Sequence, residues 1–278
     1  MRNEKRSIGI VCLFLGIILL AYTQAFAGWE TGAKVGFDSN IDRAVNDGKS
    51  DSYLTAYLSL LKNPSGESRV DWTMAATLEG TALAKISDLD YASLTLAPGL
   101  TFIPHRAWTI NLSPLVQAKA VVDSDQSAIA FGGKLSLRQQ IAKDVYIGEY
   151  YIYQDSRANV DTYSFTENSI GAFLGVNWTR SFFTEIGYEF SRGDSFRTIS
   201  TTSTGVSTIG RGKSRRYSTA FQEDVIREQV DRQAIGLSAG IDWTKSFFSH
   251  VAYTFTTTRG DSGTAISNSG FIGIGYRF

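Results

Sequence analysis

Charged side chains at spaced positions are the residues of this sequence that could do chemistry. Basic residues occur near the middle of the chain, and acidic residues follow them. Two such groups facing each other across water would set an electric field that acts on small polar solutes, as in the constriction of a pore. The alternative is that they pair and fill a narrow interior. The candidate pore-lining residues are Lys119, Lys134, Arg138, Glu149, Glu167, Glu185 and Glu189.

A second basic group lies in a stretch rich in Gly, Ser and Thr, and consists of Arg211, Lys213, Arg215 and Arg216. Three interpretations are open. The stretch could fold into a pore as a constriction that favours anions, or it could rest on lipopolysaccharide phosphates. It could also be a solvated loop, as runs of charge commonly are.

The histidines do not favour an enzyme. A hydrolase needs a histidine base near a nucleophile or an acid. The two histidines, His105 and His250, fall at or beside predicted turns on different hairpins, and no nucleophile motif accompanies them. We therefore expect no catalytic residues and no enzymatic activity.

A metal or cofactor site is not indicated either. The sequence Asp38-x-Asn40-x-Asp42 begins like a calcium-binding loop. However, Arg43 replaces the required glycine, and Lys49 stands where the bidentate glutamate belongs. The only cysteine, Cys12, lies near the N-terminus and leaves the rest of the chain without thiol chemistry. We expect neither a metal nor another cofactor.

Alternating apolar and polar segments must position the charged residues. In 128–141, Ile129 and Phe131 share one face, whereas Lys134 and Arg138 share the other. This period of two predicts strands, and hence an all-β, transmembrane, antiparallel up-and-down barrel. Side chains can fill the interior of a barrel of roughly eight strands, and a barrel of twelve strands is wider than that. The predicted strands are 29–37, 52–61, 69–83, 91–102, 108–122, 128–141, 145–154, 166–178, 182–191, 232–243, 247–258 and 268–278.

Short and long connections alternate between these segments. The short turns follow the even-numbered strands and are predicted to be periplasmic, so both termini are periplasmic as well. The longer connections follow the first, seventh, ninth and eleventh strands and are predicted to lie outside. The longest, 192–231, is long enough to hide a further hairpin, which would make fourteen strands.

A sequence repeat supports this register. The stretches SIGAFLGVNWTRSFFTEIGYEF and AIGLSAGIDWTKSFFSHVAYTF each read as a strand, a short charged turn and a strand. Aromatic residues on both sides of such a turn are typical of a membrane–water interface. The predicted interface aromatics are Phe102, Trp108, Trp178, Phe182, Phe183, Trp243, Phe247 and Phe248.

The last strand ends on an aromatic residue. Ile272, Ile274 and Tyr276 alternate with small or polar residues up to Phe278. Such an apolar edge invites aggregation in water, whereas a closed barrel in a membrane pairs both edges. The ending Gly273-x-x-Tyr276-x-Phe278 resembles the terminal signal by which bacterial outer-membrane barrels are recognised, which implies the barrel-assembly machinery as a partner.

Residues 1–27 have the features of a secretory signal peptide. Basic residues precede an apolar run, and Ala25-Phe26-Ala27 offers a cleavage site. The predicted mature domain, 28–278, has 24 basic and 26 acidic residues. This balance argues against nucleic-acid binding.

The opening of the mature chain carries a family resemblance. Residues 35–41, VGFDSNI, with 50–53, SDSY, are similar to the first hairpin of outer-membrane β-barrels of the putative-porin type, and of barrels that follow periplasmic helical repeats. No such repeats are present. The resemblance implies a bacterial outer-membrane location, with the membrane lipids and lipopolysaccharide as partners. We expect a porin-like passive channel for small polar solutes. The alternative is a non-conducting structural or partner-binding barrel, whose protein partner the sequence does not identify.

Overall fold

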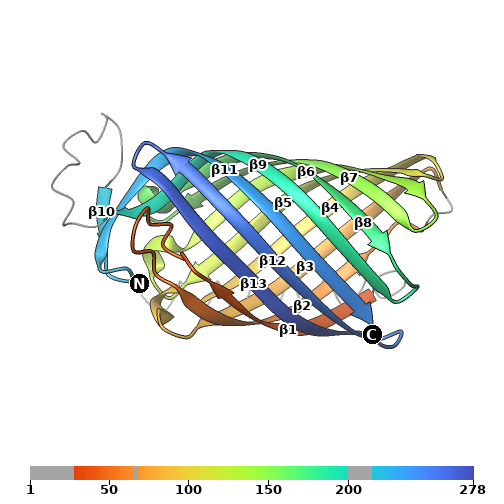
Figure 1. Cartoon of the computed structure of the whole chain (residues 1–278), viewed down its shortest axis with the longest axis horizontal. Helices are drawn as coiled ribbons and strands as arrows, with labels where there is room; N and C mark the ends of the chain where they lie inside the picture. The colour runs from red at the N-terminus through yellow and green to blue at the C-terminus, as the bar shows by residue number, and fades with distance from the viewer. Residues whose placement is uncertain (1–27, 66–67, 200–214) are drawn as a thin grey trace, which may run out of the picture.

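The structure is a computed structural model that describes residues 28–65, 68–199 and 215–278 (Figure 1). The predicted signal peptide 1–27, Arg211 and Lys213 lie outside the described residues. Strands dominate the fold: β1 (Gly28–Asp38), β2 (Asp51–Lys62), β3 (Val70–Leu83), β4 (Tyr91–His105), β5 (Trp108–Val121), β6 (Ala128–Ala142), β7 (Val145–Ala158), β8 (Phe165–Asn177), β9 (Phe182–Ile199), β10 (Arg215–Ser218), β11 (Glu223–Asp242), β12 (Phe247–Gly260) and β13 (Gly263–Arg277).

Twelve of these strands close into one antiparallel barrel. Each strand pairs with its neighbours in the chain, β13 returns to pair with β1, and β9 pairs with β11. Strand β10 pairs with β11 alone, at one end of the barrel. The predicted up-and-down barrel of twelve strands is confirmed, and the alternative of fourteen strands is wrong because β10 adds a hairpin to the rim rather than to the wall.

The two ends of the barrel differ in their connections. At the turn end, where β1 begins and β13 stops, β4, β6, β8 and β11 lead into turns of two to four residues. At the loop end, most connections are longer, and their described residues include three short 3₁₀ helices: η1 (Ser87–Leu89), η2 (Ser124–Gln126) and η3 (Asp161–Tyr163). Within the described ranges, no helix is long and apolar enough to cross a membrane.

Several strands run farther toward the loop end than the alternation predicts. The β9–β11 ladder reaches from Phe182 to Ile199, so most of the described part of the predicted loop 192–231 is strand. Likewise, β12 and β13 pair as far as Gly260 and Gly263, which leaves a tight turn in place of the predicted longer connection. The strands continue beyond the end of the apolar alternation. This is possible because the backbone hydrogen bonds of the ladder do not depend on lipid-facing side chains.

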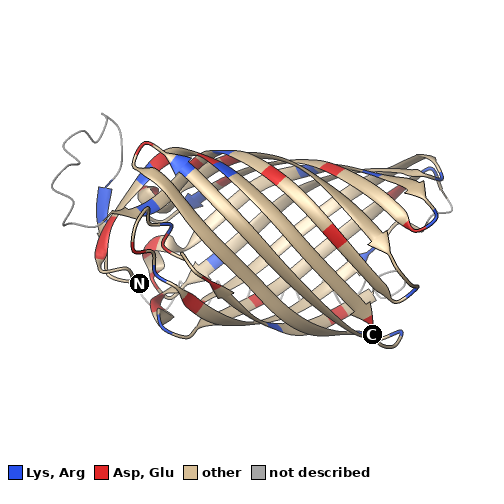
Figure 2. Cartoon of the chain, viewed as in Figure 1, with Lys and Arg blue, Asp and Glu red and all other residues tan. Residues whose placement is uncertain are grey.

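The outer surface of the barrel is apolar along most of its length. Large hydrophobic side chains such as Leu58, Leu112, Ile170 and Ile272 are at least 40% exposed. Lys, Arg, Asp and Glu gather mainly toward the two ends (Figure 2). An exposed apolar band of this extent is a lipid-facing surface.

One seam of the barrel wall is incomplete. The β4–β5 ladder pairs Leu96 with Val116 and Leu100 with Leu112, but the three residues between them on each strand are unpaired across this seam. The constant register places Pro98 opposite Pro114. Proline has no N–H to donate, so ladder bonds are missing here.

The two copies of the sequence repeat form matching hairpins, β8–β9 and β11–β12. The indole Nε1 of Trp178 donates to Thr184 Oγ1, and that of Trp243 donates to Ser249 Oγ, both at 2.9 Å. A threonine in each turn, Thr179 or Thr244, accepts a bond from the backbone N–H three residues later. The same residues at the same offsets thus make the same turn twice.

Candidate functional site

The lumen of the barrel is the candidate site, and most of the predicted charged residues lie on its wall. Each alternates along its strand with lipid-exposed neighbours, as Lys134 does with Leu135 and Glu185 with Ile186. The inward positions place cations on β5 and β6 and carboxylates on β8 and β9. The residues on the inward face are Lys119, Lys134, Arg138, Glu167, Glu185 and Glu189.

Glu149 is an exception, because it lies on the outer face of β7. It pairs directly with the outward Leu137 and is exposed alongside Tyr151 and Tyr153. Residues opposite each other in an antiparallel ladder share a face. The predicted place of Glu149 in the lumen is therefore wrong.

Two parallel chains of contact cross the inner wall from β6 to β9. The Arg138 guanidinium lies 3.8 Å from the ring centroid of Tyr146, whose hydroxyl donates to Glu185 at 2.6 Å. Four residues farther along each strand, Lys134 lies 5.0 Å from the Tyr150 ring, whose hydroxyl donates to Glu189 at 2.8 Å. Tyrosines thus connect the basic sector to the acidic sector along the wall.

Glycines let these tyrosines lie flat. A Cβ at Gly175 would overlap the ring of Tyr146, and a Cβ at Gly171 would overlap that of Tyr150. Both glycines are on β8, between the tyrosines on β7 and the carboxylates on β9. The same arrangement holds for Tyr57 over Gly32 in β1. Bulky side chains therefore cover the wall instead of filling the lumen.

Further inward-facing charges were not singled out from the sequence. Lys34 on β1 pairs with Glu79 on β3 at 3.3 Å, and Tyr91 also donates to Glu79 at 2.8 Å. At the turn end, Arg277 pairs with Glu30 at 3.2 Å and with Asp242 at 2.8 Å. The alternation along each strand could have identified these charged residues, because each of them alternates with outward-facing apolar residues.

The predicted interface aromatics divide between the two faces. Phe102, Trp108 and Phe247 are exposed at the turn end, Trp178 and Trp243 are 63% exposed there, and Phe182 is half-buried beside them. The prediction is wrong for Phe183 and Phe248, which point inward. Their rings lie over Gly240 and Gly275. Two adjacent phenylalanines on a strand must occupy opposite faces, so only one of each pair can reach lipid.

Loops close over the lumen at the loop end. A small apolar core forms there from Leu89 of η1, Tyr163 of η3, and Phe221 and Val225 of the β10–β11 hairpin. The Phe196 ring of β9 stacks on Phe221 with centroids 6.0 Å apart. We call this set the outer cap. It joins elements from opposite sides of the barrel.

Ion pairs reinforce the outer cap. Arg197 and Glu228 form a fully buried pair at 2.8 Å, and Arg197 also donates to the backbone oxygens of Arg43 and Gly263 at 3.2 and 2.9 Å. One arginine thereby ties β9, β11, the β12–β13 turn and the loop 39–50 together. Ser262 of that turn donates to Glu228 as well.

The described members of the predicted basic loop have acidic partners. Arg215 pairs with Asp224 inside the β10–β11 hairpin. Arg216 pairs with Asp125 of η2 at 2.6 Å, which carries the hairpin across the mouth to the β5–β6 connection. Their predicted effect on ion selectivity stays a prediction.

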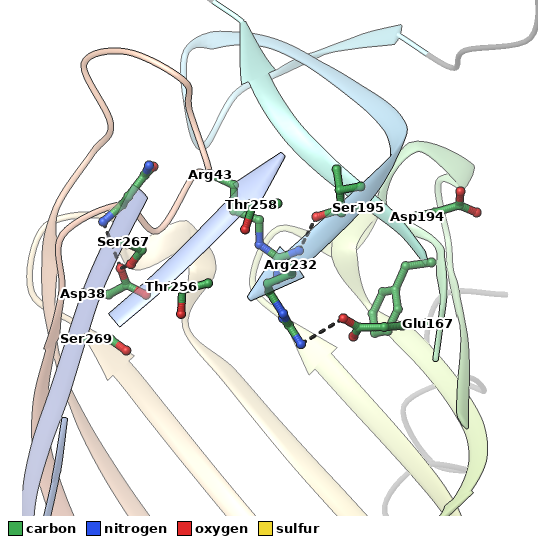
Figure 3. A pocket seen from close by; sticks show the side chains of 13 residues that line it. Asp38, Arg43, Glu167, Asp194, Ser195, Arg232, Thr256, Thr258, Ser267 and Ser269 are labelled. Carbon is green, nitrogen blue, oxygen red and sulfur yellow. Dashed lines mark hydrogen bonds and ion pairs between the residues drawn. The ribbon is translucent and has the colours of Figure 1, made fainter. Parts of the chain in front are cut away.

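A cavity of about 170 Å³ lies directly below the outer cap (Figure 3). The loop 39–50 supplies Arg43, whose Nη1 donates to Ser195 Oγ at 2.5 Å. Arg232 of β11 also lines the cavity and is held by Glu167 and Glu189 at 2.8 and 3.3 Å. Burial, together with the nearby Arg232, lowers the pKa of Arg43 to about 10, so this guanidinium stays charged at neutral pH.

The remaining predicted residues have the following surroundings. His105 is exposed in the β4–β5 turn, and His250 lies inward between Phe248 and Phe271 on the opposite part of the wall. In the part of the chain that the structure describes, no group of three or more His, Cys, Asp or Glu could hold a metal ion. In the last strand, Gly273 supports the His250 ring, whereas Tyr276 and Phe278 are exposed and their rings meet edge to face.

No protein-family model matches the chain, and no curated protein matches it. Solved structures do resemble it. The COG4313 outer membrane channel from Pseudomonas putida F1 aligns with a TM-score of 0.60 at 9% identity, over 90% of this chain and 96% of that one. KdgM porin in complex with disordered oligogalacturonate aligns with a TM-score of 0.52 at 8% identity, over 90% and 99%. At such identities the likeness concerns the fold, and the chain has the fold of outer-membrane β-barrel channels.

Proposed function

We propose that the protein is a passive channel that lets small polar solutes cross a bacterial outer membrane. The observation that carries this proposal is the inner wall of the barrel. Cations on β5 and β6 face the lumen on the same side of the wall as carboxylates on β8 and β9, and the aromatic side chains between them lie flat over glycines. Such a wall keeps an aqueous path open and polar.

The same proposal includes how the chain is exported and how the barrel is assembled in the membrane. Residues 1–27 act as a cleaved signal peptide, and Gly273, Tyr276 and Phe278 act as the terminal signal for the barrel-assembly machinery. The exposed apolar band supports a membrane location, with lipid around the strands and lipopolysaccharide around the loop end. The turn end then faces the periplasm.

The outer cap favours a second candidate, a non-conducting structural or partner-binding barrel. Phe221 and Leu89 meet in one apolar core over the mouth, and the Arg197–Glu228 pair reinforces it. A barrel closed in this way would expose its loops to a surface partner without passing solute. Under the channel proposal, the same cap limits the conductance to a small value.

Reconstitution in planar bilayers separates the two candidates. The channel proposal predicts small, discrete currents from the purified wild-type protein, and currents no larger than those of protein-free bilayers would refute it. The Glu185→Gln and Glu189→Gln variants should shift the reversal potential in a salt gradient toward anion preference, because each removes a lumen carboxylate. Glu149→Gln is the matched control: it removes an outward carboxylate and should leave the reversal potential unchanged.

A further inference from the structure

The cavity below the outer cap contains two opposite charges that do not pair with each other. Asp38 ends β1, and Arg43 lies five residues later in the loop that turns back into the mouth. Among the described residues, neither side chain makes an ion pair within 4 Å, although both line the same cavity. Figure 3 shows both side chains among those that line the cavity.

The other charges of this cavity are compensated. Arg232 is held between Glu167 and Glu189. Asp194 pairs with Arg227 at 2.7 Å. Arg43 and Asp38 therefore leave one positive and one negative pole within the same space.

The positive pole is oriented for a carboxylate. The Arg43 guanidinium lies 4.8 Å from the ring centroid of Phe196, and Ser195 occupies one of its terminal nitrogens. These two contacts fix the plane of the guanidinium and leave its other N–H groups without a described partner. A planar, fixed guanidinium binds a carboxylate through two parallel hydrogen bonds.

The negative pole suits an ammonium group. One oxygen of Asp38, Oδ1, accepts bonds from the Asn40 N–H at 2.8 Å and from the Ser267 hydroxyl at 2.6 Å. The other oxygen, Oδ2, makes no hydrogen bond within the described parts of the chain. The Thr256 and Ser269 hydroxyls also line this side of the cavity and can accept the remaining protons of an ammonium.

We infer that this cavity is a binding site for small zwitterions that carry a carboxylate and an ammonium group, such as short-chain free amino acids. The carboxylate binds Arg43 and the ammonium binds Asp38. The inference rests on the proposed channel function, because it names the class of solute that the lumen admits. A volume of about 170 Å³ restricts the site to short side chains.

A series of matched ligands tests the inference on the wild-type protein in detergent. Isothermal titration calorimetry should detect L-alanine, whereas propionate and ethylamine, which each keep one charged group, should bind at least tenfold more weakly. The loss of one charge-assisted contact is expected to be of this order. Equal affinity for L-alanine and propionate, or no binding of L-alanine at millimolar concentration, would overturn the inference.

Variants locate the site. Arg43→Gln and Asp38→Asn should each weaken L-alanine binding about tenfold or more, and asparagine keeps an oxygen for the Ser267 and Asn40 donors. Arg259→Gln removes an exposed arginine at the same rim and should bind L-alanine like the wild type. If Arg43→Gln folds as a barrel and binds L-alanine normally, the assignment of the carboxylate to Arg43 is wrong.

Bilayer currents keep this inference separate from the channel proposal. A conducting protein whose current is reduced by millimolar L-alanine but not by propionate supports both statements. A conducting protein whose current is indifferent to L-alanine contradicts only the zwitterion site. L-Alanine binding by a protein that never conducts supports the site and refutes the channel.

Discussion

The loop end and the turn end of this barrel follow different rules of construction. At the loop end, side chains from five connections and strands meet in an apolar core, and a buried ion pair lies beside it. At the turn end, the connections are short, and rings such as Phe248 lie flat against glycines. In the first arrangement side chains fill the space between loops, as in the core of a soluble protein, whereas in the second the rings lie along the wall. The molecule thus has an apolar cap at one end and flat aromatic side chains on the wall at the other.

The largest effect should come from breaking the buried ion pair. Arg197→Ala removes the guanidinium that pairs with the buried Glu228 carboxylate, and breaking such a buried pair costs about 3–5 kcal/mol. The outer cap should open, so that trypsin cleaves after Arg215 or Arg216 and the bilayer conductance rises severalfold. In the double variant Arg197→Met/Glu228→Leu, which removes both charges, the cap should stay closed. An unchanged cleavage pattern in Arg197→Ala would show that the pair does not hold the cap.

The apolar core of the cap should be nearly as sensitive. Phe221 is almost fully buried, and Phe221→Ala removes its contacts with Leu89 and Phe196 at a cost of about 3 kcal/mol. We expect higher conductance and faster proteolysis of the hairpin, with the barrel itself still resistant to unfolding in detergent. Tyr217→Ala, which changes an exposed residue of the same hairpin, is the control and should behave like the wild type.

Along the inner wall, where the rings lie flat over glycines, an added methyl group should matter more than a lost one. Gly171→Ala places a methyl group where the Tyr150 ring lies, with an overpacking cost of about 1–3 kcal/mol. The ring must move into the lumen, so the conductance should fall. Gly80→Ala is the control, because Gly80 lies on the outer face of β3 and no atom lies within 4 Å of its added Cβ. Equal conductance in both variants would contradict the role of the flat rings.

The smallest effect should come from the repeated hairpins. Trp178→Phe and Trp243→Phe each remove one exposed indole hydrogen bond, worth about 0.5–1.5 kcal/mol. Because the two hairpins make the same bonds, the two variants should lower the unfolding midpoint in urea by similar small amounts. A much larger loss in either variant would show that the two copies differ in what they support.

The barrel itself could be predicted from the sequence because its determinant is local. Segment 128–141 alternates so regularly that its predicted bounds agree with β6 to within one residue. The alternation along a strand does not show which face points into the lumen when both faces carry aromatic residues. In β7, Tyr146 and Tyr150 face the lumen while Tyr151 and Tyr153 face lipid, so one strand alone does not reveal the face of Glu149. The deciding residues are glycines on the next strand.

The outer cap and the cavity could not be predicted in the same way. Arg43 meets Ser195, which is 152 residues away in the chain, and Asp42 meets Thr198 over a similar distance. Such contacts depend on how loops fold across a closed barrel, which no periodicity encodes. In the sequence, the polar loop 39–50 is similar to the start of a calcium loop, and Arg43, the residue that excludes calcium, is the one that lines the cavity.

The two prolines that face each other across β4 and β5 make the wall mechanically uneven. The ladders on either side, β3–β4 and β5–β6, are continuous, whereas the β4–β5 ladder is interrupted in the middle of the lipid-facing wall. When a bilayer of different thickness strains the cylinder, the deformation will concentrate at the weakest join. We therefore expect the wall to deform first at the seam that holds Pro98 and Pro114, on the side of the barrel away from the β9–β11 ladder.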